Sequence, residues 1–287
     1  MYNFEELDWT DIRDLFRKWR EGNERKSDDV IQLWEAVLED RQEKLGNERY
    51  IVLEQVIISA LDCARIDIAD KCIKILNKKF PKSLRVLKYQ AMKLEAMECY
   101  DDALQILDTL ISRDETNAAP RKRRITIFME RGRNVEAIKE LTEYLKIFMS
   151  DQEAWQMLSD LYLAEGDLSK AAFCVEELIL HNPHSHLLHQ RLADIKYTQG
   201  GFENWEIAKV YYSQSIKLNP NNVRSLYGLY LTSVNLSNSQ KLAAAKKKEH
   251  VKLGQWALNQ VKNIHDKQKC DSSLVKSLES ALGSLQI

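Results

Sequence analysis

Glycine and proline are scarce in this chain, with 9 and 4 among 287 residues. Because these residues mark turns and breaks, their scarcity favours long helices joined by short turns. No apolar run of about 18 residues occurs, which argues against a membrane-spanning helix. The first nine residues contain three acidic residues and no basic one, so we expect neither a secretory signal nor a mitochondrial presequence.

Cysteine pairs and catalytic motifs are also lacking. The five cysteines are scattered without a Cys-x-x-Cys pair, so we expect reduced, mostly buried thiols in a cytosolic protein. The formal net charge is −1, which argues against general attraction to nucleic acid. No Gly-x-Ser-x-Gly, phosphate-binding glycine-rich loop or His-Glu-x-x-His occurs. The sequence therefore predicts a protein that is not an enzyme, needs no cofactor and binds no nucleic acid.

The segment from residue 152 to residue 183 has a distinctive pattern. Trp155, Leu158 and Tyr162 are spaced by three and four, so they share one stripe of a predicted helix. A turn glycine, a small residue for close helix packing and a closing proline follow: Gly166, Ala171 and Pro183. Tetratricopeptide repeats (TPRs) have Trp, Leu, Tyr, Gly, Ala and Pro at these positions. The segment is therefore interpreted as one TPR unit.

The pattern recurs at an interval of 34 residues. Small alanines share one register, each followed four residues later by an aliphatic residue: Ala69, Ala103, Ala137 and Ala171. Gly132 precedes Gly166 by 34, and Pro81 precedes Pro183 by three such intervals. We therefore predict four units beginning near residues 50, 84, 118 and 152, and a fifth from about residue 186 to residue 220. The fifth unit has three extra residues, because its Ala208 follows Ala171 by 37.

The predicted fold is all-α, a TPR superhelical solenoid of about five to six helix-pair repeats with capping helices at both ends. Residues 1–49 are assigned to N-terminal capping helices, and residues 50–220 to the TPR array. Residues 221–265 are a degenerate repeat or C-terminal cap, and residues 266–287 a tail that is either disordered or folds on a partner. Second helices of the units are expected at residues 67–79, 101–111, 134–148, 168–180 and 205–218.

Helices are also expected on both sides of the array. Thr10 and Ser27 are predicted to cap two N-terminal helices, the second of which ends at Gly46. After the array, helices are expected at residues 223–234 and 241–265, with a polar turn at residues 235–240. Three tryptophans are interpreted as core side chains: Trp34, Trp155 and Trp205.

The third unit departs from the pattern, because Arg121 and Arg124 replace its Trp and Leu. With Lys122 and Arg123 they form the densest basic run in the sequence. One interpretation is a docking patch for an acidic segment of a partner. The alternative is a solvated helix turn in which an arginine stem packs on apolar neighbours.

Binding residues are predicted from the TPR register, in which the first helix of each unit lines the inner groove. The residues expected to face a partner there are Lys88, Lys122, Arg123, Thr126, Gln156, Asp160 and Gln190. One type of TPR protein clamps chaperone tails with Lys and Asn on successive first helices. That combination is absent here, which argues against such a clamp.

A histidine cluster follows the fourth unit. His181 and His184 flank the proline that ends the unit, and His186 and His189 begin the next helix. Neutral imidazoles are common zinc ligands, so one interpretation is a metal site. The other is a turn that happens to be rich in histidine, because no cysteine lies nearby and no carboxylate has ligand spacing. We predict no bound metal.

Three stretches are not explained by the TPR pattern alone: Arg-Lys-Trp-Arg at 17–20, Lys-Ala-Ala-Phe-Cys at 170–174 and Lys-Tyr-Thr-Gln-Gly-Gly at 196–201. Together with residues 95–98, 100–103, 151–155, 176–178 and 182–184, they follow one another in the order of a known family. The chain resembles the family of subunit 2 of the endoplasmic reticulum (ER) membrane protein complex, EMC. This resemblance covers roughly residues 5 to 260, and the tail after residue 265 departs from it.

The resemblance implies a scaffold without catalytic residues, held peripherally on the cytoplasmic side of the ER membrane by the complex. That complex inserts tail-anchored and multipass proteins into the membrane. The TPR groove would hold cytosolic segments of its membrane subunits and contact a second, soluble cytosolic subunit. Two alternatives remain open from the sequence. One is another TPR adaptor or co-chaperone that binds peptide tails in the cytosol, and the other is an enzyme with a metal at the histidine cluster.

Overall fold

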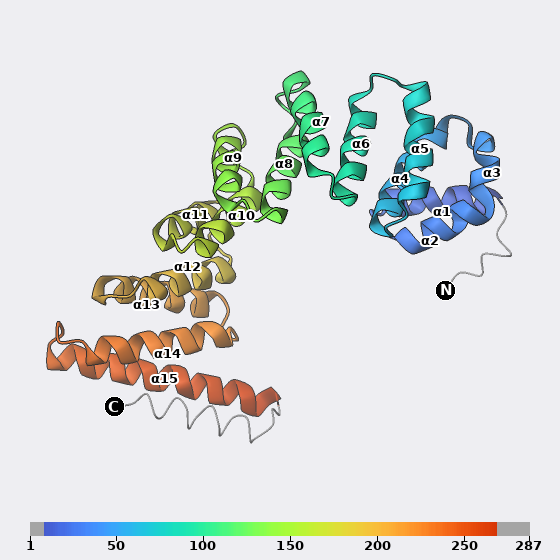
Figure 1. Ribbon diagram of the computed structural model, residues 1–287. Coiled ribbons are helices and arrows are strands. Elements are labelled where there is room, and N and C mark those ends of the chain that lie inside the picture. The colour runs from blue at the N-terminus through green and yellow to red at the C-terminus, as the bar shows by residue number, and fades with distance from the viewer. Residues whose placement is uncertain (1–8, 269–287) are drawn as a thin grey trace. The chain divides into compact units, whose positions relative to one another are not determined.

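The computed structural model describes residues 9–268, which form helices and no strand. The chain divides into two compact units, residues 1–133 and residues 134–287. Figure 1 shows that each unit consists of helices stacked side by side and joined by short turns. The predicted all-α fold is therefore confirmed.

The first unit begins with short helical segments before α4 and continues with regular helix pairs. Its elements are α1 (Trp9–Glu21), α2 (Ser27–Leu33), a π-helical turn (Trp34–Leu38), α3 (Glu39–Arg41), a 3-10 segment (Gln42–Glu48), α4 (Arg49–Asp62), α5 (Ile66–Lys79), α6 (Leu84–Ala96), α7 (Tyr100–Arg113) and α8 (Ala118–Glu130).

The second unit contains the helices α9 (Asn134–Ile147), α10 (Gln152–Ala164), α11 (Leu168–His181), α12 (His186–Gln199), α13 (Phe202–Leu218), α14 (Val223–Asn238) and α15 (Ala244–Gln268). The five predicted second helices match α5, α7, α9, α11 and α13 to within three residues at each end. We call α4, α6, α8, α10, α12 and α14 the first helices. The tail predicted at residues 266–287 lies outside the described residues, except for its first three, which continue α15.

The repeated small residues have the role that their spacing predicts. The alanines are fully buried, and the aliphatic residue four positions later is at most 3% exposed in every unit: Ala69, Ala103, Ala137 and Ala171 with Ile73, Leu107, Leu141 and Val175. Gly132 and Gly166 have φ angles of +67° and +77°, so both adopt the left-handed conformation that favours glycine. The three extra residues of the fifth unit lengthen its second helix, since α13 has 17 residues and α11 has 14.

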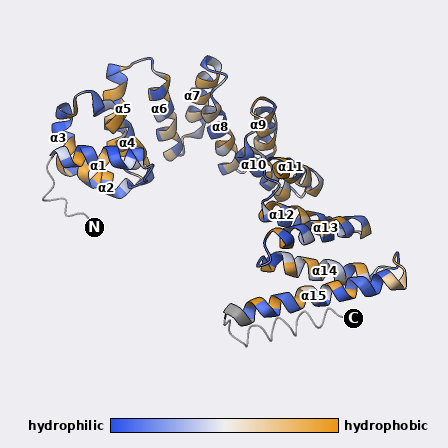
Figure 2. Ribbon diagram, turned by 180° about the vertical axis from the view of Figure 1, so that it is seen from behind, coloured by the Kyte–Doolittle hydropathy of each residue, from blue (hydrophilic) through white to orange (hydrophobic). Residues whose placement is uncertain are grey.

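Side-chain caps mark the starts of α8, α10, α11 and α14. Asp151, Asp167 and Asn222 each accept a hydrogen bond from the backbone N–H three residues later, at 3.1–3.2 Å. Asn117 accepts one from the N–H of Ala119 at 3.1 Å. These bonds satisfy backbone donors that the first turn of a helix leaves without partners. Figure 2 shows that the helices carry hydrophobic and hydrophilic residues together, as expected for elements with one buried face.

The N-terminal helices differ from the prediction in their details. Thr10 lies inside α1, and Ser27 is the first residue of α2, where its hydroxyl bonds to Asp62 at 2.7 Å. The predicted second helix is not continuous, because the backbone becomes π-helical at Trp34 and 3-10 near Gly46, whose φ is +52°. Trp34 begins the π-helical turn, is 2% exposed and packs in the core of the first unit.

The connection between the last two helices also differs. The polar composition predicts a turn over residues 235–240, but α14 continues to Asn238. Leu236 is fully buried, and this contact with the core keeps the last turn helical. α15 consequently begins at Ala244 rather than at Lys241.

We expect Asp62→Asn to weaken the docking of α2 on α4. Asp62 accepts bonds from Arg25 at 2.5 and 2.7 Å and from Ser27 at 2.7 Å. The Arg25 bond, with help from Ser27, lowers the pKa of Asp62 below its usual 3.8. The stabilisation is therefore present above pH 3.8 and is lost as the pH falls through the lowered value. At pH 7 the variant should lose about 1 kcal/mol of unfolding free energy.

Urea unfolding at pH 7 and at pH 3 checks this prediction. The difference between wild type and Asp62→Asn should shrink at the lower pH, because protonation weakens the wild-type bonds. Glu130→Gln, at an exposed position at the end of α8, is the matched control and should match wild type at pH 7. A loss of equal size at both pH values would show that the carboxylate charge is irrelevant.

Candidate functional site

In the first unit, one of the predicted groove residues is a partly buried cation. Lys88 on α6 is half-buried, and its Nζ lies 5.4 Å from the centroid of the Tyr89 ring. Burial lowers the pKa of Lys88, and the positive charge of Arg123 lowers it further. An ammonium group in these surroundings is incompletely hydrated and suits an incoming carboxylate.

Arg123 on α8 is tied to the neighbouring first helix. Its Nη1 lies 2.5 Å from Oε2 of Glu95 on α6. Burial raises the pKa of Glu95, against the opposing effect of Arg123. Because this pair is mostly buried, Arg123 has a structural role in joining α6 and α8.

Two further predicted residues lie on α8. Lys122 is half-buried and Thr126 is exposed. The Thr126 hydroxyl donates to the backbone oxygen of Lys122 at 3.0 Å, one helical turn earlier. The hydroxyl is thus already bonded within its own helix.

The basic run is engaged with groups of its own unit. Arg124 pairs with Asp108 at 2.8 Å, and its side chain is only 21% exposed. Arg121 donates to the backbone oxygen of Glu115 at 3.5 Å. Arg121 and Arg124 are thus bonded to groups of the first unit, and both interpretations of the basic run stay predictions.

In the second unit, the predicted groove residues bond to each other within α10 and to other polar residues across successive first helices. Gln156 donates to Asp160 at 3.2 Å, and Asp160 forms an ion pair with Arg191 of α12. Gln190 on α12 accepts from Asn222 at 2.9 Å, which joins α12 to the start of α14. Polar side chains held by these bonds therefore line one surface of α10 and α12.

A polar hollow of about 590 Å³ lies on the same face of the second unit. Its walls include Gln156, Gln190, Arg191 and Asp194, and Asp194 also pairs with Arg224 of α14 at 3.0 Å. The structure thus brings Gln156 and Gln190 to one hollow on the first helices. We call this surface the first-helix face.

The histidine cluster is spread over different environments. His189 is buried, with its Nε2 2.8 Å from the backbone oxygen of Pro183, while His181 and His184 are exposed. His186 bonds to Asn222 at 3.0 Å. Within residues 9–268, no group of three or more His, Cys, Asp or Glu side chains is placed to hold a metal ion.

The cysteines that the structure describes are free thiols. Cys72 and Cys174 are buried, and burial raises the pKa of each to about 12. Cys63 and Cys99 are half-buried, and Cys270 lies outside the described residues. High pKa values leave few thiolates at neutral pH, so the two buried thiols are poor nucleophiles.

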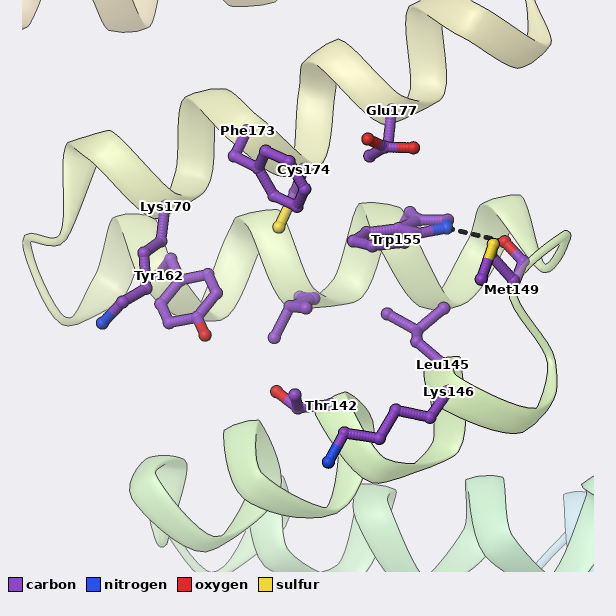
Figure 3. A pocket seen from close by; sticks show the side chains of 11 residues that line it. Thr142, Leu145, Lys146, Met149, Trp155, Tyr162, Lys170, Phe173, Cys174 and Glu177 are labelled. Carbon is purple, nitrogen blue, oxygen red and sulfur yellow. Dashed lines mark hydrogen bonds between the residues drawn. The ribbon is translucent and has the colours of Figure 1, made fainter.

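A second hollow was missed by the sequence analysis. It measures about 450 Å³ and lies between α9, α10 and α11 of the second unit (Figure 3). Its lining is largely apolar: Leu145, Met149, Trp155, Leu158, Tyr162, Phe173 and Cys174, with Thr142, Lys146, Lys170 and Glu177. We call it the Trp155 pocket.

Trp155 forms one wall of this pocket. Its Nε1 donates to the backbone oxygen of Met149 at 2.8 Å, and its ring meets Phe173 edge-on at 6.1 Å between centroids. Trp34 is buried as predicted, but Trp155 and Trp205 are only half-buried. The TPR pattern identifies Trp155 but gives no sign that its neighbours leave part of the ring open.

Paired antiparallel helices with this 34-residue repeat and a polar first-helix face define a TPR protein. The solved structures agree on the fold. The C-terminal part of a TPR protein from Cytophaga hutchinsonii matches with a TM-score of 0.62 and 15% identity, covering 93% of this chain and 99% of its own. The TPR protein YrrB matches with a TM-score of 0.51 and 12% identity over 72% of this chain and 97% of its own.

The sequence comparisons are more specific. The family model described as the EMC2 TPR-like repeat domain matches residues 68–216. ER membrane protein complex subunit 2 of Xenopus tropicalis is 47% identical over 98% of this chain and 96% of its own length. The protein of the same name from Dictyostelium discoideum is 30% identical over 93% of this chain and 86% of its own. The chain belongs to the EMC2 family.

The alignment with the Xenopus protein also corrects the expected extent of the resemblance. Because it covers 98% of the chain, it reaches past residue 265, where the sequence analysis expected the likeness to end. Among residues 9–268, no helix combines the length and apolar character needed to cross a membrane.

Proposed function

We propose that this chain is a non-catalytic scaffold subunit of the ER membrane protein complex. The observation that carries the proposal is the 47% identity, over nearly the whole of both chains, to a protein named as subunit 2 of that complex. The proposed place is the cytoplasmic side of the ER membrane, where other subunits hold the chain peripherally. The complex would insert tail-anchored and multipass proteins, and the membrane chemistry would belong to its other subunits.

The first-helix face supports a role in holding segments of partner subunits. Its helices α10 and α12 are already formed, and the ion pair of Asp160 with Arg191 links them. A preformed surface reduces the ordering cost of binding an extended or helical tail. Cytosolic segments of membrane subunits and a soluble cytosolic subunit are the partners proposed for this face.

Affinity purification of the tagged full chain in mild detergent tests the proposal. We expect a fixed set of multispanning ER proteins in near-equal amounts, identified by mass spectrometry. Recovery of soluble chaperones without membrane subunits would instead support the alternative of a cytosolic TPR adaptor or co-chaperone. The same alternative applies if no multispanning protein is recovered.

Lys88→Met is expected to weaken capture of partner subunits without destabilising the fold. A charged group whose pKa is lowered by burial opposes folding at neutral pH, so removing it should leave the melting temperature unchanged or higher. Losing a charge-assisted bond to a partner carboxylate should reduce capture about tenfold. Quantitative recovery and thermal melting of the same preparations measure the two effects.

The matched control is Lys78→Met, which removes an exposed lysine from the last turn of α5. It should change neither recovery nor melting. If both variants capture partners as wild type does, Lys88 does not bind them. If Lys88→Met lowers melting and capture together, the lysine supports the fold instead.

A further inference from the structure

The Trp155 pocket is separate from the first-helix face. Each residue of an α-helix advances by about 100°, so Trp155 and Tyr162 share one side of α10, and Gln156 and Asp160 lie about 100–160° further round the helix axis. The other walls come from α9 and α11, which are second helices. A partner bound in this pocket therefore leaves the first-helix face free.

The rim of the pocket exposes large apolar side chains. Met149 and Phe173 are 65% and 53% exposed. On α11 the apolar surface continues from Phe173 past Glu177 to Leu180, at helical spacings of four and three, and Leu180 is 76% exposed. Isolated apolar residues at a surface are ordinary, but a stripe that continues a largely apolar hollow is typical of a docking surface.

The charges at the pocket indicate what kind of segment fits. Figure 3 shows the ammonium groups of Lys146 and Lys170 on the side of Thr142 and Tyr162, away from Met149. Their present ion-pair partners are the residues three positions earlier, Glu143 of α9 at 2.6 Å and Asp167, which caps α11, at 2.7 Å. Nζ of Lys170 also lies 5.3 Å from the centroid of the Tyr162 ring. The lysine side chains are 64% and 63% exposed, so both pairs are weak and a partner's carboxylate can replace or join them.

We propose that the Trp155 pocket binds a segment of a partner polypeptide that inserts one bulky apolar side chain and places an acidic residue toward Lys146 and Lys170. The apolar side chain packs against the rings of Trp155 and Phe173, within the largely apolar lining of the pocket. The segment then follows the stripe on α11 toward Leu180. Apolar anchors in a groove give affinity, and the charged contact sets the direction of the segment.

Site-specific photo-crosslinking in the full chain tests this surface. p-Benzoylphenylalanine replaces Phe173, and in a matched control it replaces Val210 of α13, which is 60% exposed and outside the pocket. After irradiation in cells, the crosslinked peptide is sequenced by mass spectrometry. We expect one main segment from position 173, with a bulky apolar residue and an Asp or Glu within four residues of it.

A synthetic, fluorescein-labelled peptide of that segment then serves as the probe. Its affinity for the purified chain, measured by fluorescence anisotropy, should fall at least about tenfold when Lys146→Glu and Lys170→Glu are combined. Replacing the acidic residue of the peptide by Lys should restore binding to that variant. Because both lysines are exposed, circular dichroism of the variant should match wild type.

Four results would overturn the inference. Three concern the crosslink: equal crosslinking at positions 173 and 210, a crosslink to a lipid acyl chain, or a crosslink to a second copy of this chain. The fourth is a peptide whose affinity does not change when Lys146→Glu and Lys170→Glu are combined. The inference also stands apart from the proposed function. A matching segment from a protein outside the ER membrane complex would support the pocket and contradict the assignment to that complex.

Discussion

Gly228→Ala is expected to destabilise the second unit strongly, although alanine normally stabilises a helix relative to glycine. Gly228 lies in the interior of α14, against the ring of Tyr212 on α13. A methyl group there would overlap that ring, meeting its Cε2 at 2.8 Å. Tyr212 cannot move aside easily, because it is 2% exposed and its hydroxyl donates to Asp194 at 2.6 Å. The overlap should cost about 3 kcal/mol of unfolding free energy.

Gly254→Ala is the matched control for this result. Gly254 also lies inside a helix, α15, and a methyl group there would meet Cβ of Ser233 at 3.5 Å, an ordinary contact. This variant should gain about 0.5–1 kcal/mol from helix propensity alone. Guanidinium unfolding of the two variants compares them directly. If Gly228→Ala were as stable as Gly254→Ala, α13 and α14 would not pack as closely as the structure has them.

Much of the fold could be predicted because TPR units repeat a few residues with fixed geometric roles. Ala171 is small where two helices touch, and Gly166 has a positive φ that other residues adopt only at a cost. Each requirement concerns a single position and recurs every 34 residues, so the residue type at that position predicts the helix contact or the turn. The π-helical turn at Trp34 is different, because it depends on how a large ring reaches a core built by several helices.

The candidate sites were less predictable, because they also depend on how several helices are placed relative to one another. The register places Gln156 and Asp160 on the first-helix face, but the ion pair of Asp160 with Arg191 depends on the distance between two helices. The Trp155 pocket is the space that α9, α10 and α11 leave unfilled, and no single residue encodes an unfilled volume. The other units have no glycine at the position of Gly228, and the need for a glycine there is visible only from its contact with Tyr212.

Ala171→Leu is the second change for which we expect a large loss of stability. Ala171 is fully buried where α11 crosses α10, among Val175, Leu192 and Ile195. Its backbone oxygen also accepts a bond from the buried hydroxyl of Ser159 on α10, at 3.4 Å. A leucine side chain would force the two helices apart and break that contact, at a cost of about 3 kcal/mol. Far-ultraviolet circular dichroism during urea unfolding measures the loss.

The matched control adds the same side chain at Ala164→Leu, an exposed position in the last turn of α10. Its stability should stay within about 0.5 kcal/mol of wild type. In a stacked array each helix pair depends on its neighbours, so the loss at Ala171 should also loosen the contact of α11 with α12. Faster hydrogen exchange in α12 of Ala171→Leu would show this coupling. Unchanged exchange in α12, together with a lowered unfolding midpoint, would mean that the damage stays within one helix pair and that the units are less coupled than their shared core implies.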